Sequence, residues 1–157
     1  MDLADYYYKL ATDNGHIESQ FYLGVLYHNQ GKLELAEQYY KLATDKGYTD
    51  AQHSLGNLYY NQRKMELAEQ YFKLAADNGY TEAQYNLGTL YHEQGKRSVS
   101  EQYLKLAADN GHVEGQFNLG VLYYEQGKED LAQKYWKLAA DKGHIEAKNN
   151  VRVLRRK

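Results

Sequence analysis

The sequence predicts an all-α fold, an α-solenoid of about ten helices built from stacked helix–turn–helix units. Three observations predict it: the 157-residue chain repeats itself every 32 residues, it contains no proline, and glycine recurs where each helical pattern stops. One hairpin of two short helices cannot bury its apolar face by itself. The hairpins are therefore expected to stack on one another and share a continuous core.

The repeat register covers nearly the whole chain and predicts a single domain, residues 1–157. No linker or low-complexity segment interrupts it. The register gives a half repeat, four full repeats and a C-terminal capping helix: 2–16, 17–48, 49–80, 81–112, 113–144 and 145–157.

Each full repeat carries two helical patterns, which we name the A helix and the B helix. The pattern TEAQYNLGTLYHEQ (81–94) is typical of the A helix, and ELAEQYFKLAADNG (66–79) precedes it as a B helix. Apolar residues recur in both at helical spacing, and a glycine able to adopt the left-handed conformation ends each pattern. Thr49 with Gln52 and Thr81 with Gln84 read as capping boxes. Arg63 replaces the terminal glycine in one repeat, so that turn is expected to differ or to be strained.

Constant columns of the repeat indicate the scaffold. A mid-helix glycine in each A helix costs about 1 kcal/mol relative to alanine, which indicates a close crossing against a small residue of the B helix. These two columns are Gly24, Gly56, Gly88 and Gly120, and Ala36, Ala68, Ser100 and Ala132. The columns expected to form the core are Leu10/42/74/106/138, Ala11/43/75/107/139, Tyr7/39/71/103/135 and Tyr27/59/91/123.

The motifs resemble two related repeat families. The pattern L-G-x-L-Y (23–27, 55–59, 87–91 and 119–123) resembles the first helix of tetratricopeptide repeats, and K-L-A-A-D-N-G-x-x-E-A-Q (73–84) is similar to Sel1-like repeats. The resemblance covers essentially the whole chain. It implies a right-handed superhelix that acts as a protein–protein interaction module or scaffold, with the A helices lining its concave surface.

Carried over column by column, this resemblance predicts a peptide-binding site on the concave face. The three columns are Phe21, His53, Tyr85, Phe117; Val25, Asn57, Thr89, Val121; and His28, Tyr60, His92, Tyr124. The third column is flanked by Asn29, Asn61, Glu93 and Glu125. Such a groove would be aromatic, polar and mildly acidic, and would suit a protein or peptide with aromatic or apolar anchors and some Lys or Arg. Packing between neighbouring A helices is the alternative role of these side chains.

A fourth column, Glu18, Asp50, Glu82 and Glu114, lies in the first turn of each A helix. It is expected to complement the helix dipole or to form an acidic rim. His16, His112 and His144 follow the terminal glycines at positions where Tyr48 and Tyr80 stand in other repeats. A loop residue of aromatic size is therefore expected at this position.

Other function classes find little support in the sequence. We expect no enzyme, because no H-E-x-x-H, P-loop or G-x-S-x-G pattern is present, and no cofactor or metal. The chain has no cysteine and a net charge of −2, so nothing indicates a thiolate metal site or a global field for nucleic acid. RNA binding would rest only on Arg152, Arg155, Arg156 and Lys157, which a polar end cap explains equally well. Mean hydropathy is −0.85, and no apolar run approaches a membrane span.

Several alternatives stay open at this stage. The chain is expected to be cytoplasmic by default, since it shows neither a signal peptide nor a membrane span. It would be a monomer or associate end to end through an uncapped N-terminal hairpin, where Tyr6, Tyr7 and Tyr8 are expected to be partly exposed. An engineered or purely structural repeat scaffold without a natural ligand is the main alternative function.

Overall fold

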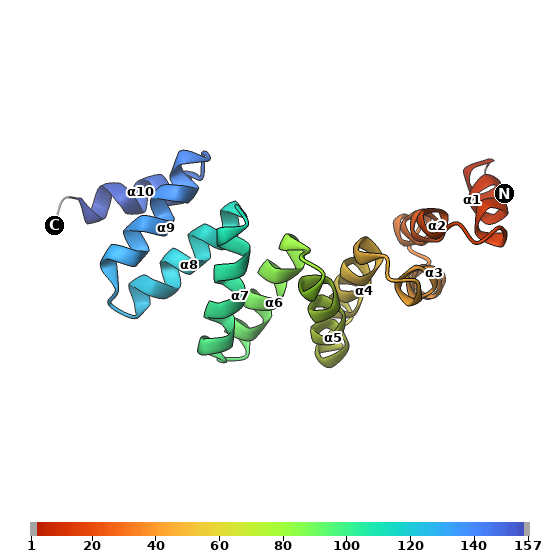
Figure 1. Ribbon diagram of the computed structural model, residues 1–157, viewed down its shortest axis with the longest axis horizontal. Helices are drawn as coiled ribbons and strands as arrows, with labels where there is room; N and C mark the ends of the chain where they lie inside the picture. The colour runs from red at the N-terminus through yellow and green to blue at the C-terminus, as the bar shows by residue number, and fades with distance from the viewer. Residues whose placement is uncertain (1–2, 156–157) are drawn as a thin grey trace. The chain divides into compact units, whose positions relative to one another are not determined.

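A computed structural model describes residues 3–155, apart from the side chains at positions 3, 4, 7 and 11. The all-α prediction is confirmed: this part of the chain forms ten α-helices and no strand (Figure 1). The helices are α1 (Leu3–Asp13), α2 (Ile17–Asn29), α3 (Leu33–Asp45), α4 (Thr49–Asn61), α5 (Met65–Asp77), α6 (Thr81–Glu93), α7 (Arg97–Asp109), α8 (Val113–Glu125), α9 (Glu129–Asp141) and α10 (Ile145–Leu154).

The chain forms two compact units, residues 1–80 and 81–157. In the first unit α1 to α5 pack in chain order, each against the next helix that the unit contains, with α2 on α3 and α4 on α5 as the hairpins. The second unit is built in the same way, with α6 on α7 and α8 on α9 as hairpins and α10 against α9. The division falls at a predicted repeat boundary. The single-domain organisation remains a prediction, and its ends at residues 1–2 and 156–157 lie outside the described residues.

A large B-helix side chain explains the mid-helix glycines. A Cβ added to Gly56 would lie 2.5 Å from Phe72, and one added to Gly120 would lie 2.4 Å from Trp136. We call these B-helix side chains the floor residues: Tyr40, Phe72, Leu104 and Trp136. The small column four residues earlier is also buried at the crossing, where the Ser100 hydroxyl donates a 2.7 Å hydrogen bond to the Gly88 carbonyl.

The predicted core is correct for two columns and wrong for one. Ala43, Ala75, Ala107 and Ala139 are fully buried, and Tyr27, Tyr59, Tyr91 and Tyr123 are at most 7% exposed. The leucines Leu10, Leu42, Leu74, Leu106 and Leu138, by contrast, are between 40% and 48% exposed. The leucines at 42, 74, 106 and 138 each stand one residue before a buried alanine, about 100° around the helix, and so lie off the face that contacts the neighbouring helices. The remaining tyrosine column is half-buried at positions 39, 71 and 103 and buried at 135.

The helix ends differ from the capping prediction. Helix α4 begins at Thr49 with Tyr48 as its N-cap and no side-chain cap bond, and α6 begins at Thr81. A capping box needs the threonine at the N-cap position, and each of these threonines is instead the first residue of its helix. The turn at Arg63 is not altered: Arg63 has φ 61°, its N–H bonds the Tyr60 carbonyl at 3.0 Å, and the Lys64 N–H bonds the Tyr59 carbonyl at 2.9 Å. This is a Schellman ending with arginine at the left-handed position, so the turn is strained.

Candidate functional site

The twelve predicted site residues all lie on A helices, six in each unit. None of them is buried: His28, His92 and Tyr124 are exposed and the other nine are half-buried. Side chains of this kind are accessible to a partner and also contact their neighbours, so each column needs its contacts examined.

The first column packs against the loop that follows the next B helix. We call the residues of that loop the loop aromatics: Tyr48, Tyr80, His112 and His144. Their ring centroids lie close to those of the first column, at 5.2 Å for Phe21–Tyr48, 4.8 Å for His53–Tyr80, 4.5 Å for Tyr85–His112 and 4.3 Å for Phe117–His144. One face of each first-column ring is therefore occupied by the loop that ends the same repeat.

In the second unit the two histidines do more than stack. The Nδ1 of His112 accepts a 3.0 Å hydrogen bond from the Gly115 N–H and thereby caps α8, while its Nε2 lies 2.8 Å from the Glu82 carboxylate. Because a backbone N–H can only donate, Nδ1 carries the lone pair and Nε2–H donates to Glu82. His144 repeats this arrangement, with Nδ1 3.2 Å from the Ala147 N–H and Nε2 3.3 Å from Glu114.

The sequence indicated the size of this residue but not its bonds. The i, i+3 relation between His112 and the helical N–H it caps was the available signal, and an acidic residue 30 positions earlier was the second. Glu82 and Glu114, expected to complement a helix dipole or form a rim, each contact a histidine of the next loop.

The middle and third columns lie over the hairpin crossing. Asn57 bonds His53 at 3.3 Å, and the Thr89 hydroxyl donates to the Tyr85 carbonyl at 3.1 Å. In the third column the rings sit near the floor residues, with centroid distances of 6.4 Å for His28–Tyr40, 6.5 Å for Tyr60–Phe72 and 5.5 Å for Tyr124–Trp136. Burial raises the pKa of Tyr40 to about 12, as expected for a phenol in an apolar floor.

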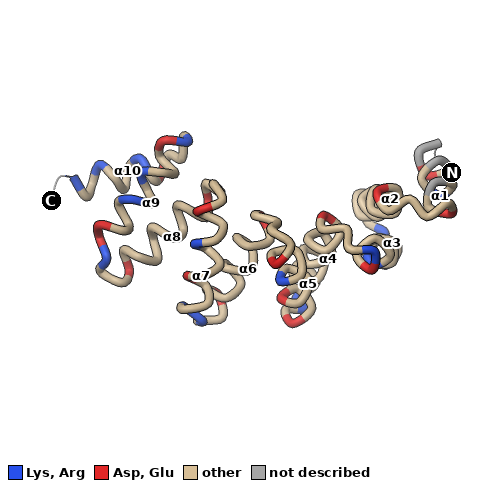
Figure 2. The backbone as a smooth tube through the Cα atoms, viewed as in Figure 1, with Lys and Arg blue, Asp and Glu red and all other residues tan. Residues whose placement is uncertain are grey.

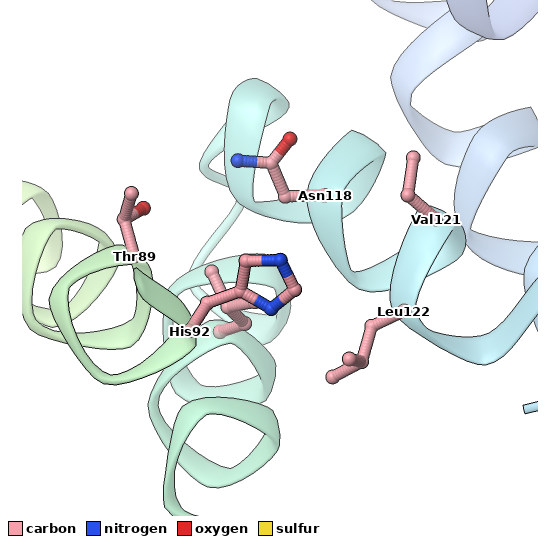
Figure 3. A pocket seen from close by; sticks show the side chains of 6 residues that line it. Thr89, His92, Asn118, Val121 and Leu122 are labelled. Carbon is pink, nitrogen blue, oxygen red and sulfur yellow. The ribbon is translucent and has the colours of Figure 1, made fainter. Parts of the chain in front are cut away.

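A hollow lies where the floor residue is smallest. Leu104 stands at the position that Tyr40, Phe72 and Trp136 occupy in other repeats, and a cavity of about 120 Å³ opens above it. Its lining comes from α6, α7 and α8: Thr89, His92, Leu104, Asn118, Val121 and Leu122. Figure 3 shows the His92 ring reaching into this space, with Thr89 and Asn118 on one side and Val121 and Leu122 on the other. The structure thus brings three predicted site residues together around one cavity.

Acidic residues stand at the C-terminal ends of the A helices in the second unit. Glu93 and Glu125 follow His92 and Tyr124 directly at the ends of α6 and α8, and both carboxylates are on exposed residues. Basic residues instead recur along α10, the blue segments near the C-terminus in Figure 2. Among residues 3–155 no cluster of three His, Asp or Glu is arranged to hold a metal ion. Within the same range, no helix has the length and apolar character needed to span a bilayer.

Two repeat-family models match different parts of the sequence. The Sel1 repeat model matches residues 2–16, 81–112 and 113–144, together half of the chain. The tetratricopeptide repeat model matches residues 17–45 and 49–77. Both families are generally protein–protein interaction modules. No curated protein matches the sequence.

Solved structures show the same fold. A protective antigen of uropathogenic Escherichia coli strains displaying an SLR fold is 27% identical, with a TM-score of 0.85 over 93% of this chain and 35% of its own. A Sel1 repeat protein from Oxalobacter formigenes is 24% identical, with a TM-score of 0.76 over 94% of this chain and 65% of its own. YrrB, described as a tetratricopeptide repeat protein with an unusual peptide-binding site, is 21% identical, with a TM-score of 0.64 over 92% and 80%. The chain thus spans 35% and 65% of the first two structures.

Proposed function

The chain belongs to the Sel1 repeat family, and from this premise we propose that it is a non-enzymatic interaction module that binds a peptide or partner segment on the face formed by its A helices. The observation that carries the proposal is the cavity above Leu104, which three predicted site residues line: Thr89, His92 and Val121. This cavity is lined by residues of the second unit alone, so the second unit is where we expect a ligand side chain to insert.

The lining supports a partner of defined chemistry. Leu104, Val121 and Leu122 offer apolar walls, whereas His92 and Asn118 offer hydrogen-bonding groups at the opening. Glu93 and Glu125 add negative charge nearby. A segment with an apolar anchor and neighbouring Lys or Arg matches this combination. The peptide-binding site described for YrrB supports the same mode of use for this fold.

A preorganised surface would provide affinity with little ordering on binding. The first column is already stacked on the loop aromatics, and the mid-helix glycines hold each hairpin closed on its floor residue. The side chains at the cavity therefore stand on rigid elements, as recognition of a short segment requires.

Selection from a random-peptide display library tests the proposal. The parent is compared with Val121→Lys, which places a charge at the cavity wall, and with the matched control Leu138→Lys on the exposed B-helix column, where Leu138 is 40% exposed. We expect the parent and the control to enrich the same apolar and basic motif, and Val121→Lys to lose it. Enrichment by all three variants would place the site elsewhere, and enrichment by none would favour a scaffold without a peptide ligand.

A further inference from the structure

A second cavity lies one repeat beyond the first. It measures about 250 Å³ and is lined by Val121, Tyr124, Trp136, Asn150, Val153 and Leu154. Each of these residues stands 32 positions after one of the residues that line the cavity above Leu104. The two cavities are therefore the same site, repeated on consecutive repeats of the second unit. Val121 lines both of them, so they adjoin.

From this repetition we propose that the second unit reads two anchors of one segment, an aliphatic and an aromatic side chain spaced i, i+3 in a polyproline-II-like backbone. The inference rests on the proposed function and specifies its partner. The sizes of the cavities assign the anchors: a cavity of roughly 150 Å³ accommodates a benzene ring. The cavity above Leu104 is smaller than this and suits a branched aliphatic side chain, and the one beside Trp136 has room for an aromatic ring.

The spacing follows from the distance between neighbouring A helices. Side chains of α6 and α8 are in direct contact, since the Asn118 amide donates to the Tyr85 hydroxyl at 3.3 Å, and we take the separation of the two cavities to be close to the 8–10 Å of packed helices. In polyproline II, residues i and i+3 lie on the same side and about 9 Å apart. In a β-strand, same-side neighbours at i, i+2 are only about 7 Å apart.

An α-helical ligand could place residues i and i+7 about 10 Å apart, so distance alone does not decide between an extended and a helical ligand. The polar residues of the cavities favour the extended ligand. Asn118 and Asn150 stand at equivalent positions of the two cavities, where their amides can pair with peptide backbone groups. A polyproline-II segment has no internal hydrogen bonds and needs such partners, whereas most backbone groups of a helix are already bonded.

Charge sets the remaining positions of the segment. Glu93 and Glu125 follow the third-column residue of each cavity, and both are exposed. Lysine or arginine beside the anchors would meet these carboxylates. The segment inferred is therefore basic, extended and anchored by one aliphatic and one aromatic residue with two residues between them.

Fluorescence anisotropy with synthetic peptides tests the inference on the unmodified chain. Each peptide carries one Leu and one Phe in a Lys/Ala background, in both orders, at spacings i+2, i+3, i+4 and i+7. We expect one order at i+3 to bind at least tenfold more tightly than the same order at the other spacings. Equal affinity at all spacings, or a preference for i+7, would overturn the inference while leaving a peptide-binding face in place. Absence of binding to any peptide would contradict the proposed function as well.

Leu104→Phe identifies which cavity holds the aliphatic anchor. Phenylalanine is the floor residue of another repeat, Phe72, so the fold can accommodate it, and circular dichroism checks this. We expect the Leu104→Phe variant to bind the i+3 peptide at least tenfold more weakly than the parent does. It should bind this peptide no more tightly than it binds a peptide whose Leu is replaced by Ala. Leu106→Phe, on the exposed B-helix column, is the matched control and should stay within twofold of the parent. Unchanged binding by Leu104→Phe would overturn the assignment of the cavity.

Discussion

The two units build one repeat from different side chains. In the first unit the floor residues are aromatic, and the loop aromatic Tyr48 stacks on Phe21 without a side-chain cap bond to α4. In the second unit Leu104 leaves a cavity, and His112 and His144 stack, cap the next helix and contact a glutamate. The first unit, where the tetratricopeptide model matches residues 17–45 and 49–77, thus has aromatic floor residues, whereas the second unit, where the Sel1 model matches residues 81–112 and 113–144, has capping histidines and the two cavities.

This difference shows that the repeat keeps its fold when the floor residues and the loop aromatics vary. A floor residue needs only to fit against the glycine of its partner helix, so tyrosine, phenylalanine, leucine and tryptophan all occur at this position. Exchanging residues between equivalent columns tests each part of this comparison.

Alanine substitutions at the mid-helix glycines are expected to lower the free energy of unfolding most, and by different amounts in the two units. Gly56→Ala would place Cβ 2.5 Å from the rigid Phe72 ring, whereas Gly88→Ala would place it 2.8 Å from the Leu104 Cγ and 3.0 Å from the Leu104 backbone nitrogen. We expect the free energy of unfolding to fall by about 3 kcal/mol for Gly56→Ala and about 1 kcal/mol for Gly88→Ala, since overpacking costs most against a rigid group. Urea denaturation measures both. Equal losses would refute the role of the floor residue.

The loop aromatics provide the second test. His112→Ala removes a helix cap and a ring stack, and we expect a loss of about 2 kcal/mol. Tyr48→Ala in the first unit removes only the stack, and should cost about half as much. His112→Tyr keeps the stack and loses only the cap, so it should also cost about half as much as His112→Ala in urea denaturation. A loss for His112→Ala no larger than that for Tyr48→Ala would contradict the capping role.

The strained turn provides a reciprocal pair. Arg63 has φ 61°, and the equivalent Gly95 in the second unit has φ 72°. Because the left-handed conformation costs a non-glycine residue roughly 1–2 kcal/mol, Arg63→Gly should stabilise the protein by about 1 kcal/mol. Gly95→Arg should destabilise it by a similar amount. Thermal unfolding checks both signs, and a stability loss in Arg63→Gly would show that the turn is not strained.

A buried amide in each unit is the fourth test. Asn78 donates to Gln52 at 3.0 Å and Asn110 donates to Gln84 at 2.9 Å. Where lysine replaces this asparagine, the buried side-chain oxygen of Gln20 or Gln116 finds no partner among the residues that the structure describes.

Lys142→Asn should therefore supply a donor to Gln116 and raise the free energy of unfolding by about 1 kcal/mol. The same substitution in a Gln116→Leu background is the control and should give no gain. A gain of equal size in both backgrounds would assign the effect to something other than this hydrogen bond.

The smallest expected effect is on alkaline stability. The folded pKa of Tyr40, about 12, lies above the unfolded value near 10. The Tyr40 hydroxyl loses its proton more readily in the unfolded state than in the folded state. Its contribution to stability is therefore fully present below pH 10 and is lost as pH rises toward 12. Tyr40→Phe, which copies Phe72, should show a shallower fall in Tm between pH 9.5 and 11.5. An unchanged slope of Tm against pH would mean that ionisation of Tyr40 does not contribute to the loss of stability.

The sequence predicted the architecture because the fold follows from periodicity. The repeat, its glycine stops and the A-helix columns all lie where the register puts them. The leucine column was misassigned because a step of one residue turns a helical side chain about 100°, and the apolar character of leucine outweighed that geometry. The capping histidines were missed because size alone does not reveal a hydrogen bond.

The cavities could have been approached from the sequence. The floor column varies in size from Leu104 to Trp136 while its partner glycine stays constant. That contrast is a signal for space above Leu104, but it does not indicate the larger cavity beside Trp136. What the sequence could not give is the arrangement of Asn118, His92 and Val121 around that space, because it depends on how three helices of the second unit pack.

The most direct test of the account is an amide chemical-shift titration of the ¹⁵N-labelled chain with the best-binding two-anchor peptide. We expect saturable shifts concentrated on the A-helix face, at Thr89, His92, Asn118, Val121 and Val153. Shifts concentrated instead around Leu106 and Leu138 on the exposed B-helix column would contradict the account, because the peptide would then bind away from both cavities.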